Sequence, residues 1–172
     1  MPIGTNINQP VLLGVENTPL IANHEQREHF GEHMTIDGYG GSQAKLDHSS
    51  HILQGLSLLV DRLGMKPLAE PVIYYAKGND KKDPGGWTGI LAIEESHISI
   101  HTFPAIGFVT ADVYTCRNGM AQREIVDFFR EHFSLKEIEV NFLRRGMHFM
   151  ALAMSRSSLD AQKQKVAANA QP

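Results

Sequence analysis

The sequence has 172 residues, of which 42% are hydrophobic and 20% charged, and its formal net charge is -3. This length and composition are typical of a single domain, residues 1–172, and the weak negative charge gives no support for nucleic-acid binding. The single cysteine, Cys116, excludes an internal disulfide. No apolar run approaches the ~20 residues that a transmembrane helix needs. We therefore expect a cytoplasmic protein that binds neither nucleic acid nor membranes.

The predicted elements begin after a polar N-terminal arm, residues 1–28. Loose alternation of apolar and polar residues predicts a strand over 33–39, and apolar residues at helical spacing predict a helix over 49–63 that Gly64 ends. Short segments rich in β-forming residues follow, then a second helix and a last strand. These ranges are 72–76, 88–93, 97–103 and 108–115 for strands, 120–133 for the helix and 137–143 for the last strand. Residues 156–172 are small and polar, which predicts a flexible tail.

Strands outnumber helices in this order, and several are joined by short turns. Such an order favours an α+β fold in which an antiparallel sheet carries helices on one face. The loop at 77–86 is rich in glycine, proline, asparagine and aspartate and separates two of the strands.

The densest group of reactive side chains lies at 94–104, in the order Glu-Glu-Ser-His-Ile-Ser-Ile-His-Thr-Phe-Pro. The residues alone leave three interpretations open. One is a polar strand edge whose histidines only form hydrogen bonds. A second is a metal site made by Glu94, Glu95, His97 and His101, although histidines four residues apart in a strand are separated by about 13 Å. The third is a serine that processes its own chain.

The run from Glu95 to Pro104, followed by Asp-Val-Tyr-Thr-Cys at 112–116, resembles the signature of the prokaryotic S-adenosylmethionine decarboxylases. That signature has a Glu-Ser-His start, a His-Thr-aromatic-Pro-Glu continuation and a Thr-Cys end at the same spacings. Weaker similarity extends over about residues 30–145 and includes Pro-Gly-Gly-Trp-Thr-Gly at 84–89. The resemblance favours the self-processing serine and implies a two-layer α/β sandwich.

The resemblance implies that the chain cuts itself. The Ser96 hydroxyl attacks the Glu95 carbonyl to form an ester, and β-elimination then breaks that ester. The products are a β chain, 1–95, and an α chain, 96–172, which begins with a pyruvoyl group.

Further roles follow from the same resemblance. His101 matches the residue that removes the α-proton during elimination, and a histidine suits proton transfer near neutral pH. Cys116 matches the proton donor to the product carbon, and Thr88 a hydroxyl residue that assists processing. Strand alternation places Ser96 and His101 on opposite faces, so we expect a turn or bulge at Ser96.

The pyruvoyl group acts as the electron sink that pyridoxal phosphate supplies elsewhere, so neither that cofactor nor a metal is expected. The resemblance implies an amino-acid substrate whose primary amine, next to a carboxylate, forms a Schiff base with the pyruvoyl carbonyl. It also implies a role in polyamine and spermidine biosynthesis. The expected assembly is a homodimer or higher homo-oligomer with active sites at or near the interface.

Two departures from the family pattern concern the substrate. Ala105 stands where the family has a glutamate that holds the ribose hydroxyls, and Lys82 where it has a phenylalanine that stacks on adenine. Each lost contact costs about 1–3 kcal/mol. We therefore predict a basic amino acid, L-arginine or L-ornithine, as substrate. Its cationic tail needs an acid, for which Asp37, Asp83 and Asp112 are candidates.

Alternative functions also fit the sequence. If Trp87 supplies the stacking and another acid reaches the ribose, the substrate remains S-adenosylmethionine. A non-catalytic homologue that regulates a related enzyme is a second alternative, although Ser96, His101 and Cys116 are all retained. A metal-binding module is a third, but the other histidines show no ligand spacing.

Overall fold

The computed structural model describes residues 29–79 and 81–157 of the chain. Its elements are β1 (Gly31–Tyr39), α1 (Gln43–Leu46), α2 (Ser49–Arg62), β2 (Val72–Ala76), β3 (Gly86–Ile93), β4 (Ser96–Phe103), the 3-10 helix η1 (Pro104–Ile106), β5 (Phe108–Thr115), α3 (Gln122–Phe133) and β6 (Glu137–Arg145). Residues 149–157 form a further helix. The predicted order of strands and long helices is confirmed, whereas α1, η1 and the last helix are additions to it.

Two predicted segments fall wholly or mainly outside the described residues. These are the N-terminal arm, 1–28, and the tail, 156–172, of which only 156–157 are described, as the end of the last helix. Within the described part of the chain, no helix is both long and apolar enough to cross a membrane.

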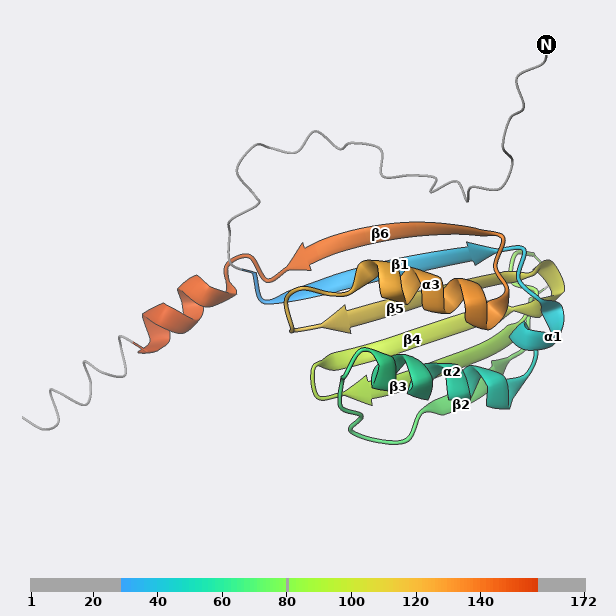
Figure 1. Ribbon diagram of the computed structural model, residues 1–172, viewed down its shortest axis with the longest axis horizontal. Coiled ribbons are helices and arrows are strands. Elements are labelled where there is room, and N and C mark those ends of the chain that lie inside the picture. The colour runs from blue at the N-terminus through green and yellow to red at the C-terminus, as the bar shows by residue number, and fades with distance from the viewer. Residues whose placement is uncertain (1–28, 80, 158–172) are drawn as a thin grey trace, which may run out of the picture.

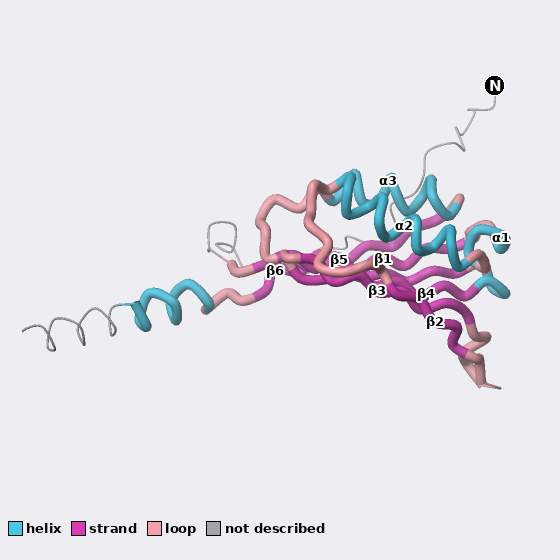
Figure 2. The backbone as a smooth tube through the Cα atoms, turned by 90° about the horizontal axis from the view of Figure 1, so that it is seen from below, coloured by secondary structure: helices cyan, strands magenta, loops and turns pink. Residues whose placement is uncertain are grey.

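The strands form one sheet in the order β2-β3-β4-β5-β1-β6, and every neighbouring pair is antiparallel (Figure 1). Helices α2 and α3 lie side by side on one face of this sheet (Figure 2). The predicted α+β class, an antiparallel sheet with helices on one face, is therefore confirmed. We call the opposite face, which no described helix covers, the open face.

The core lies between the sheet and the two long helices. Alternate side chains of β1, β4 and β5 point toward α2 and α3 and are buried, while their neighbours on the open face are partly exposed. The fully buried large side chains include Met34, Ile36, Ile52, Leu59, Leu91, Ile98, Ile125, Phe129 and Phe133. Burying each such side chain stabilises the fold by about 1.5–3 kcal/mol. The register of the sheet is therefore set by the face that packs against α2 and α3.

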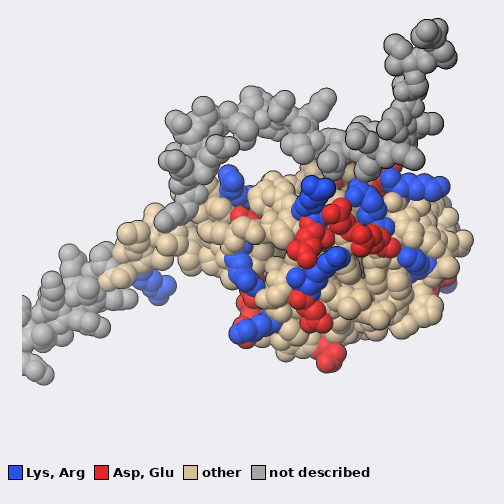
Figure 3. Space-filling model, in the orientation of Figure 1, with Lys and Arg blue, Asp and Glu red and all other residues tan. Residues whose placement is uncertain are grey.

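The outer surface of the helices carries charges of both signs. Figure 3 views the molecule from the same side as Figure 1 and shows lysine and arginine interspersed with aspartate and glutamate. Arg62 pairs with Glu124 at 3.3 Å, and Arg130 with Asp127 at 3.4 Å. Because the charges alternate, the described residues of this face form no continuous basic patch for a nucleic-acid backbone.

A pair of stacked histidines joins α2 to α3. The His51 and His132 rings lie 3.9 Å apart with only 2° between their planes. Each ring places Nε2 3.0 Å from the backbone carbonyl oxygen of the other residue. Gly55 allows this approach, since a Cβ there would lie 2.6 Å from the His132 Nε2 atom. Burial lowers the pKa of His132, which outweighs the raising effect of its hydrogen bond to the His51 backbone, and the charges of His51 and Lys45 lower the pKa further.

We expect this pair to make folding stability depend on pH. The folded state binds fewer protons at His132 than the unfolded state. The contribution of neutral His132 to the free energy of unfolding is therefore complete above the unfolded pKa of about 6.5 and is lost progressively as the pH falls below it. His132→Phe keeps a ring in the stack but removes its titration and the hydrogen bond that the ring donates. We expect the variant to be about 1 kcal/mol less stable at neutral pH and to lose less stability on acidification. Urea unfolding at several pH values measures both effects, and an unchanged pH dependence would contradict the assignment to His132.

Candidate active site

The turn between β3 and β4 holds the predicted cleavage bond. Ile93 and Ser96 are partners across the strand pair, so Glu94 and Glu95 alone connect the two strands. The φ angle of Ser96 is +150°, and among the described residues only Ser134 is another non-glycine residue with positive φ. A side chain in this region costs about 1–3 kcal/mol of local strain. The turn expected at Ser96 is thus confirmed.

The carbonyl of Glu95 already accepts a hydrogen bond. The backbone N–H of Cys116, just beyond the end of β5, donates to it at 2.8 Å. A donor fixed on a carbonyl oxygen stabilises the negative charge that develops there when a nucleophile adds to the carbonyl carbon. The Cys116 side chain is a free, exposed thiol. Glu95, Ser96 and Cys116, all predicted site residues, therefore lie together.

His97, to which the motif assigns no role, is the imidazole beside the serine. Its Nδ1 atom lies 3.1 Å from the Ser96 Oγ atom. The His97 ring is also held edge-on against Tyr114 on the neighbouring strand, with ring centres 5.7 Å apart. Its place directly after the serine, on the first open-face position of β4, is the only sequence signal for this contact.

The other predicted pair, Thr88 and His101, lies further along the sheet. These two residues are direct partners on β3 and β4, and the Thr88 Oγ1 atom is 2.9 Å from the His101 Nδ1 atom. Five positions of β4 separate His101 from Ser96, which corresponds to about 16 Å along the strand. The structure therefore brings the predicted catalytic residues together in two groups, one near the start of β4 and one near its end.

The open face between these groups is polar. Asp112 of β5 contacts the His33 Nε2 atom at 2.9 Å, and the Ser99 hydroxyl donates to the same carboxylate at 3.3 Å. Both carboxylate oxygens of Asp112 therefore have partners from the sheet itself.

Comparison with known proteins identifies the family. A sequence model of the S-adenosylmethionine decarboxylase family matches residues 32–146. The chain belongs to this family. A Clostridium botulinum (strain Langeland) relative, named S-adenosylmethionine decarboxylase proenzyme, is 32% identical over 119 residues, covering 69% of this chain and 97% of the relative. One of the same name from Persephonella marina is 31% identical and covers 68% and 83%.

A solved structure supports the same conclusion. The adenosylmethionine decarboxylase from Aquifex aeolicus VF5 superimposes with a TM-score of 0.59 at 29% identity, covering 69% of this chain and 92% of that one. Decarboxylases of this family are made as proenzymes and are pyruvoyl-dependent carboxy-lyases. The chain is accordingly a pyruvoyl-dependent carboxy-lyase, and Ser96 fits the origin of the group, since it occupies a strained turn beside a polarised carbonyl.

The positions at which this decarboxylase departs from the family pattern flank the end of the β3–β4 strand pair that carries Thr88 and His101. Ala105 is an exposed residue of η1, which directly follows β4. Lys82 and Asp83 belong to the loop that precedes β3, where their backbone N–H groups donate to the Asn79 side chain at 3.0 and 3.3 Å. Asp83 in turn accepts the backbone N–H of Gly85 at 2.8 Å. Asp83 thus stabilises its own loop.

Trp87 lies on the other face of the sheet from Thr88. Its ring Nε1–H donates to Asp47, which precedes α2, at 3.2 Å, and the ring packs edge-on against Tyr75. The structure does not bring Trp87 to the Thr88–His101 pair, because consecutive residues of a strand point to opposite faces. Stacking by Trp87 on a substrate bound at the open face therefore has no support in this decarboxylase.

A metal site at this position is also without support. Within residues 29–79 and 81–157, no three histidine, cysteine, aspartate or glutamate side chains lie close enough together to hold a metal ion. The extended β4 separates His97 from His101, as strand geometry requires.

Proposed function

We propose that this chain cuts itself between Glu95 and Ser96 and then decarboxylates a basic amino acid. The observation that supports this cleavage bond is the strained Ser96 next to a carbonyl that accepts the Cys116 N–H. The Ser96 hydroxyl oxygen adds to the Glu95 carbonyl carbon, the bond from that carbon to the Ser96 nitrogen breaks, and the nitrogen takes up the hydroxyl proton. Removal of the Ser96 α-proton expels the Glu95 carboxylate. Water then releases the nitrogen as ammonia and leaves the pyruvoyl group, which supplies the electron sink for decarboxylation.

We propose that two copies of the chain share each active site. His101, the expected base, lies about 16 Å from Ser96 along its own strand and cannot reach it there. The Ser96 hydroxyl contacts His97 on the open face, which also carries the Thr88–His101 pair. If the open faces of two copies pack against each other with their β4 strands antiparallel, the end of one β4 lies over the start of the other. Thr88 and His101 of one copy then lie beside Ser96 and Cys116 of the other. A homodimer is thus the smallest complete enzyme.

The substrate part of the proposal rests on which acid is free to bind a cation. Asp37 lies on the open face in the same cross-strand row as His101, with Thr110 between them. Among the described residues, no lysine or arginine forms an ion pair with Asp37. The other two candidates, Asp112 and Asp83, already accept hydrogen bonds. We therefore assign the cationic tail of the substrate to Asp37.

Acidic side chains around Tyr39 make the electrostatic potential negative at this end of the open face. The hydrogen bond that Tyr39 donates to Glu139, at 2.9 Å, together with burial and the charges of Glu139, Asp37 and Glu137, raises the pKa of Tyr39 to about 12. A guanidinium or ammonium tail is favoured in such a field, whereas a ribose gains little from it. Ala105, at the ribose position of the family, offers no side-chain acceptor.

S-adenosylmethionine remains the second candidate substrate, because the matched relatives carry it in their names. A cytoplasmic location belongs to the same proposal and is supported by the single cysteine, which excludes an internal disulfide.

Product analysis tests this proposal directly. The purified protein is incubated separately with L-arginine, L-ornithine and S-adenosylmethionine, and the products are identified by mass spectrometry. We expect agmatine or putrescine. The matched variant Ala105→Glu restores an acceptor for ribose hydroxyls and is expected to favour S-adenosylmethionine by about tenfold or more over the unmodified protein. Turnover of S-adenosylmethionine alone by the unmodified protein would contradict the substrate but keep the decarboxylase. An uncut, inactive chain would instead favour a regulatory homologue.

A further inference from the structure

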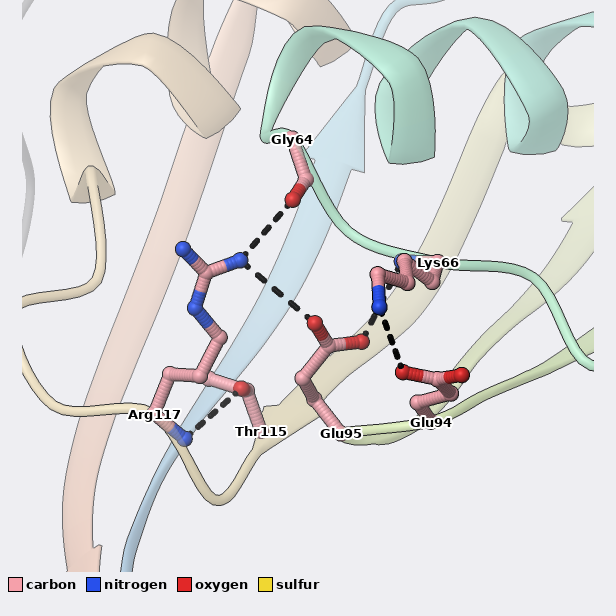
Figure 4. A network of polar contacts seen from close by, with 6 residues as sticks. All are labelled: Gly64, Lys66, Glu94, Glu95, Thr115 and Arg117. Atoms are coloured by element: carbon pink, nitrogen blue, oxygen red, sulfur yellow. Dashed lines mark hydrogen bonds and ion pairs between the residues drawn. The ribbon is translucent and has the colours of Figure 1, made fainter.

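The side chain of Glu95, directly before the proposed cleavage bond, is held from two directions (Figure 4). The Arg117 guanidinium approaches one carboxylate oxygen at 3.4 Å, and the backbone N–H of Lys66 donates to the other at 3.3 Å. The Glu95 side chain is only 13% exposed. Neighbouring Glu94 differs, because its partner is the Lys66 ammonium at 3.2 Å and both of those side chains are more than half exposed.

Arg117 is itself anchored on the end of α2. Its Nη1 atom donates to the backbone carbonyl of Gly64 at 2.9 Å, and its backbone N–H donates to the Thr115 hydroxyl at 3.0 Å. Gly64 has a φ of +59°, the conformation that ends α2 and turns its carbonyl outward. The arginine therefore connects a rigid helix terminus to the acid of the β3–β4 turn (Figure 4).

Consecutive residues thus hold Glu95 at two points. Cys116 holds its backbone carbonyl, and Arg117 holds its side chain. A second attachment, on the side chain, restricts the orientation of the Glu95 carbonyl more than the hydrogen bond to the carbonyl alone. That orientation decides whether the Ser96 hydroxyl meets the face of the carbonyl, and small misplacements of reacting groups slow a reaction strongly.

We propose that Arg117 is a positioning residue for self-cleavage, which keeps the Glu95 carbonyl on the Cys116 N–H and facing Ser96. It touches neither the attacking oxygen nor the carbonyl carbon, so its effect passes through Glu95. The inference rests on the proposed function, namely cleavage between Glu95 and Ser96.

Cleavage kinetics of newly made chains test this role. The full-length protein is made in a cell-free system, synthesis is stopped, and the loss of the 172-residue precursor is followed on gels. We expect Arg117→Ala to slow cleavage by about tenfold or more, and Arg117→Lys to recover part of the rate. The matched control is Lys66→Ala, which removes the exposed pair with Glu94 but keeps the backbone donor, and it should cleave at nearly the unmodified rate.

A double variant separates positioning from general destabilisation. If Arg117 acts through Glu95, adding Glu95→Gln to Arg117→Ala should slow cleavage little beyond the slower single variant. Independent, multiplying effects would overturn the inference, as would normal cleavage of Arg117→Ala or an equal delay in Lys66→Ala. If the unmodified chain stays whole, the proposed function fails, whereas a cut unmodified chain with a normally cut Arg117→Ala overturns only the positioning role.

Discussion

Replacing Ser96 by alanine is expected to leave the chain whole at 172 residues and without decarboxylase activity. A methyl group cannot add to the Glu95 carbonyl, and without cleavage no pyruvoyl group forms. The expected loss of activity is complete, because the reaction depends on that group as its electron sink. Intact-mass measurement distinguishes one uncut species from the two fragments expected of the unmodified protein.

Ser57→Ala is the matched control. The Ser57 hydroxyl lies on α2 and donates to the backbone carbonyl of Leu53 at 3.3 Å, away from the β3–β4 turn. This variant should be cut like the unmodified chain. Cleavage of the Ser96→Ala chain at the same bond would show that another group is the nucleophile, and cleavage elsewhere would move the site.

The second large effect concerns the sharing of sites between copies. His101→Ala should stop cleavage because the expected base is lost, and Ser96→Ala should stop it because the nucleophile is lost. Coexpression of the two inactive chains should restore cleavage of the His101→Ala chain. In the mixed dimer, that chain supplies Ser96 and its partner supplies His101. Differently tagged chains allow the cut fragments to be assigned by mass.

Two results would contradict the shared site. If the His101→Ala chain is cut when expressed alone, His101 is not required. If it stays whole in a verified mixed dimer, the base acts within one chain and must reach Ser96 by a rearrangement of β4. A Thr88→Ala chain offers a milder version of the test, since Thr88 contacts the His101 ring at 2.9 Å.

Local sequence patterns predicted most of the fold. Alternation over 108–115 coincides with β5 (Phe108–Thr115), and the helical stripe over 49–63 coincides with α2 apart from one residue. The four residues of α1 are too few to show a period. The order of the sheet could not be predicted, because β1 pairs with both β5 and β6 through residues far apart in sequence, such as His33 with Tyr114.

The same distinction between local and distant signals holds for the site. Ser96 and His101 lie on β4 and Thr88 on the neighbouring β3, and all three are predicted by resemblance to the family over short local segments. The contact of Arg117 with Glu95 joins two turns that share no motif, so it could not be predicted from sequence. The position of Trp87 could have been predicted, because consecutive residues of a strand point to opposite faces. With Thr88 on the open face, Trp87 lies on the face that the helices cover.

The strand order has a consequence for the protein after cleavage. Of the sheet β2-β3-β4-β5-β1-β6, the β chain would contribute β1, β2 and β3, and the α chain β4, β5 and β6. Since β1 lies between β5 and β6 and pairs with both, the two products would be interlocked within one sheet. The precursor folds as a single molecule, but the cleaved protein would have to refold by the meeting of two chains. Formation of its sheet after denaturation should therefore depend on protein concentration, whereas the sheet of an uncut precursor forms within one chain and should refold equally well at any dilution.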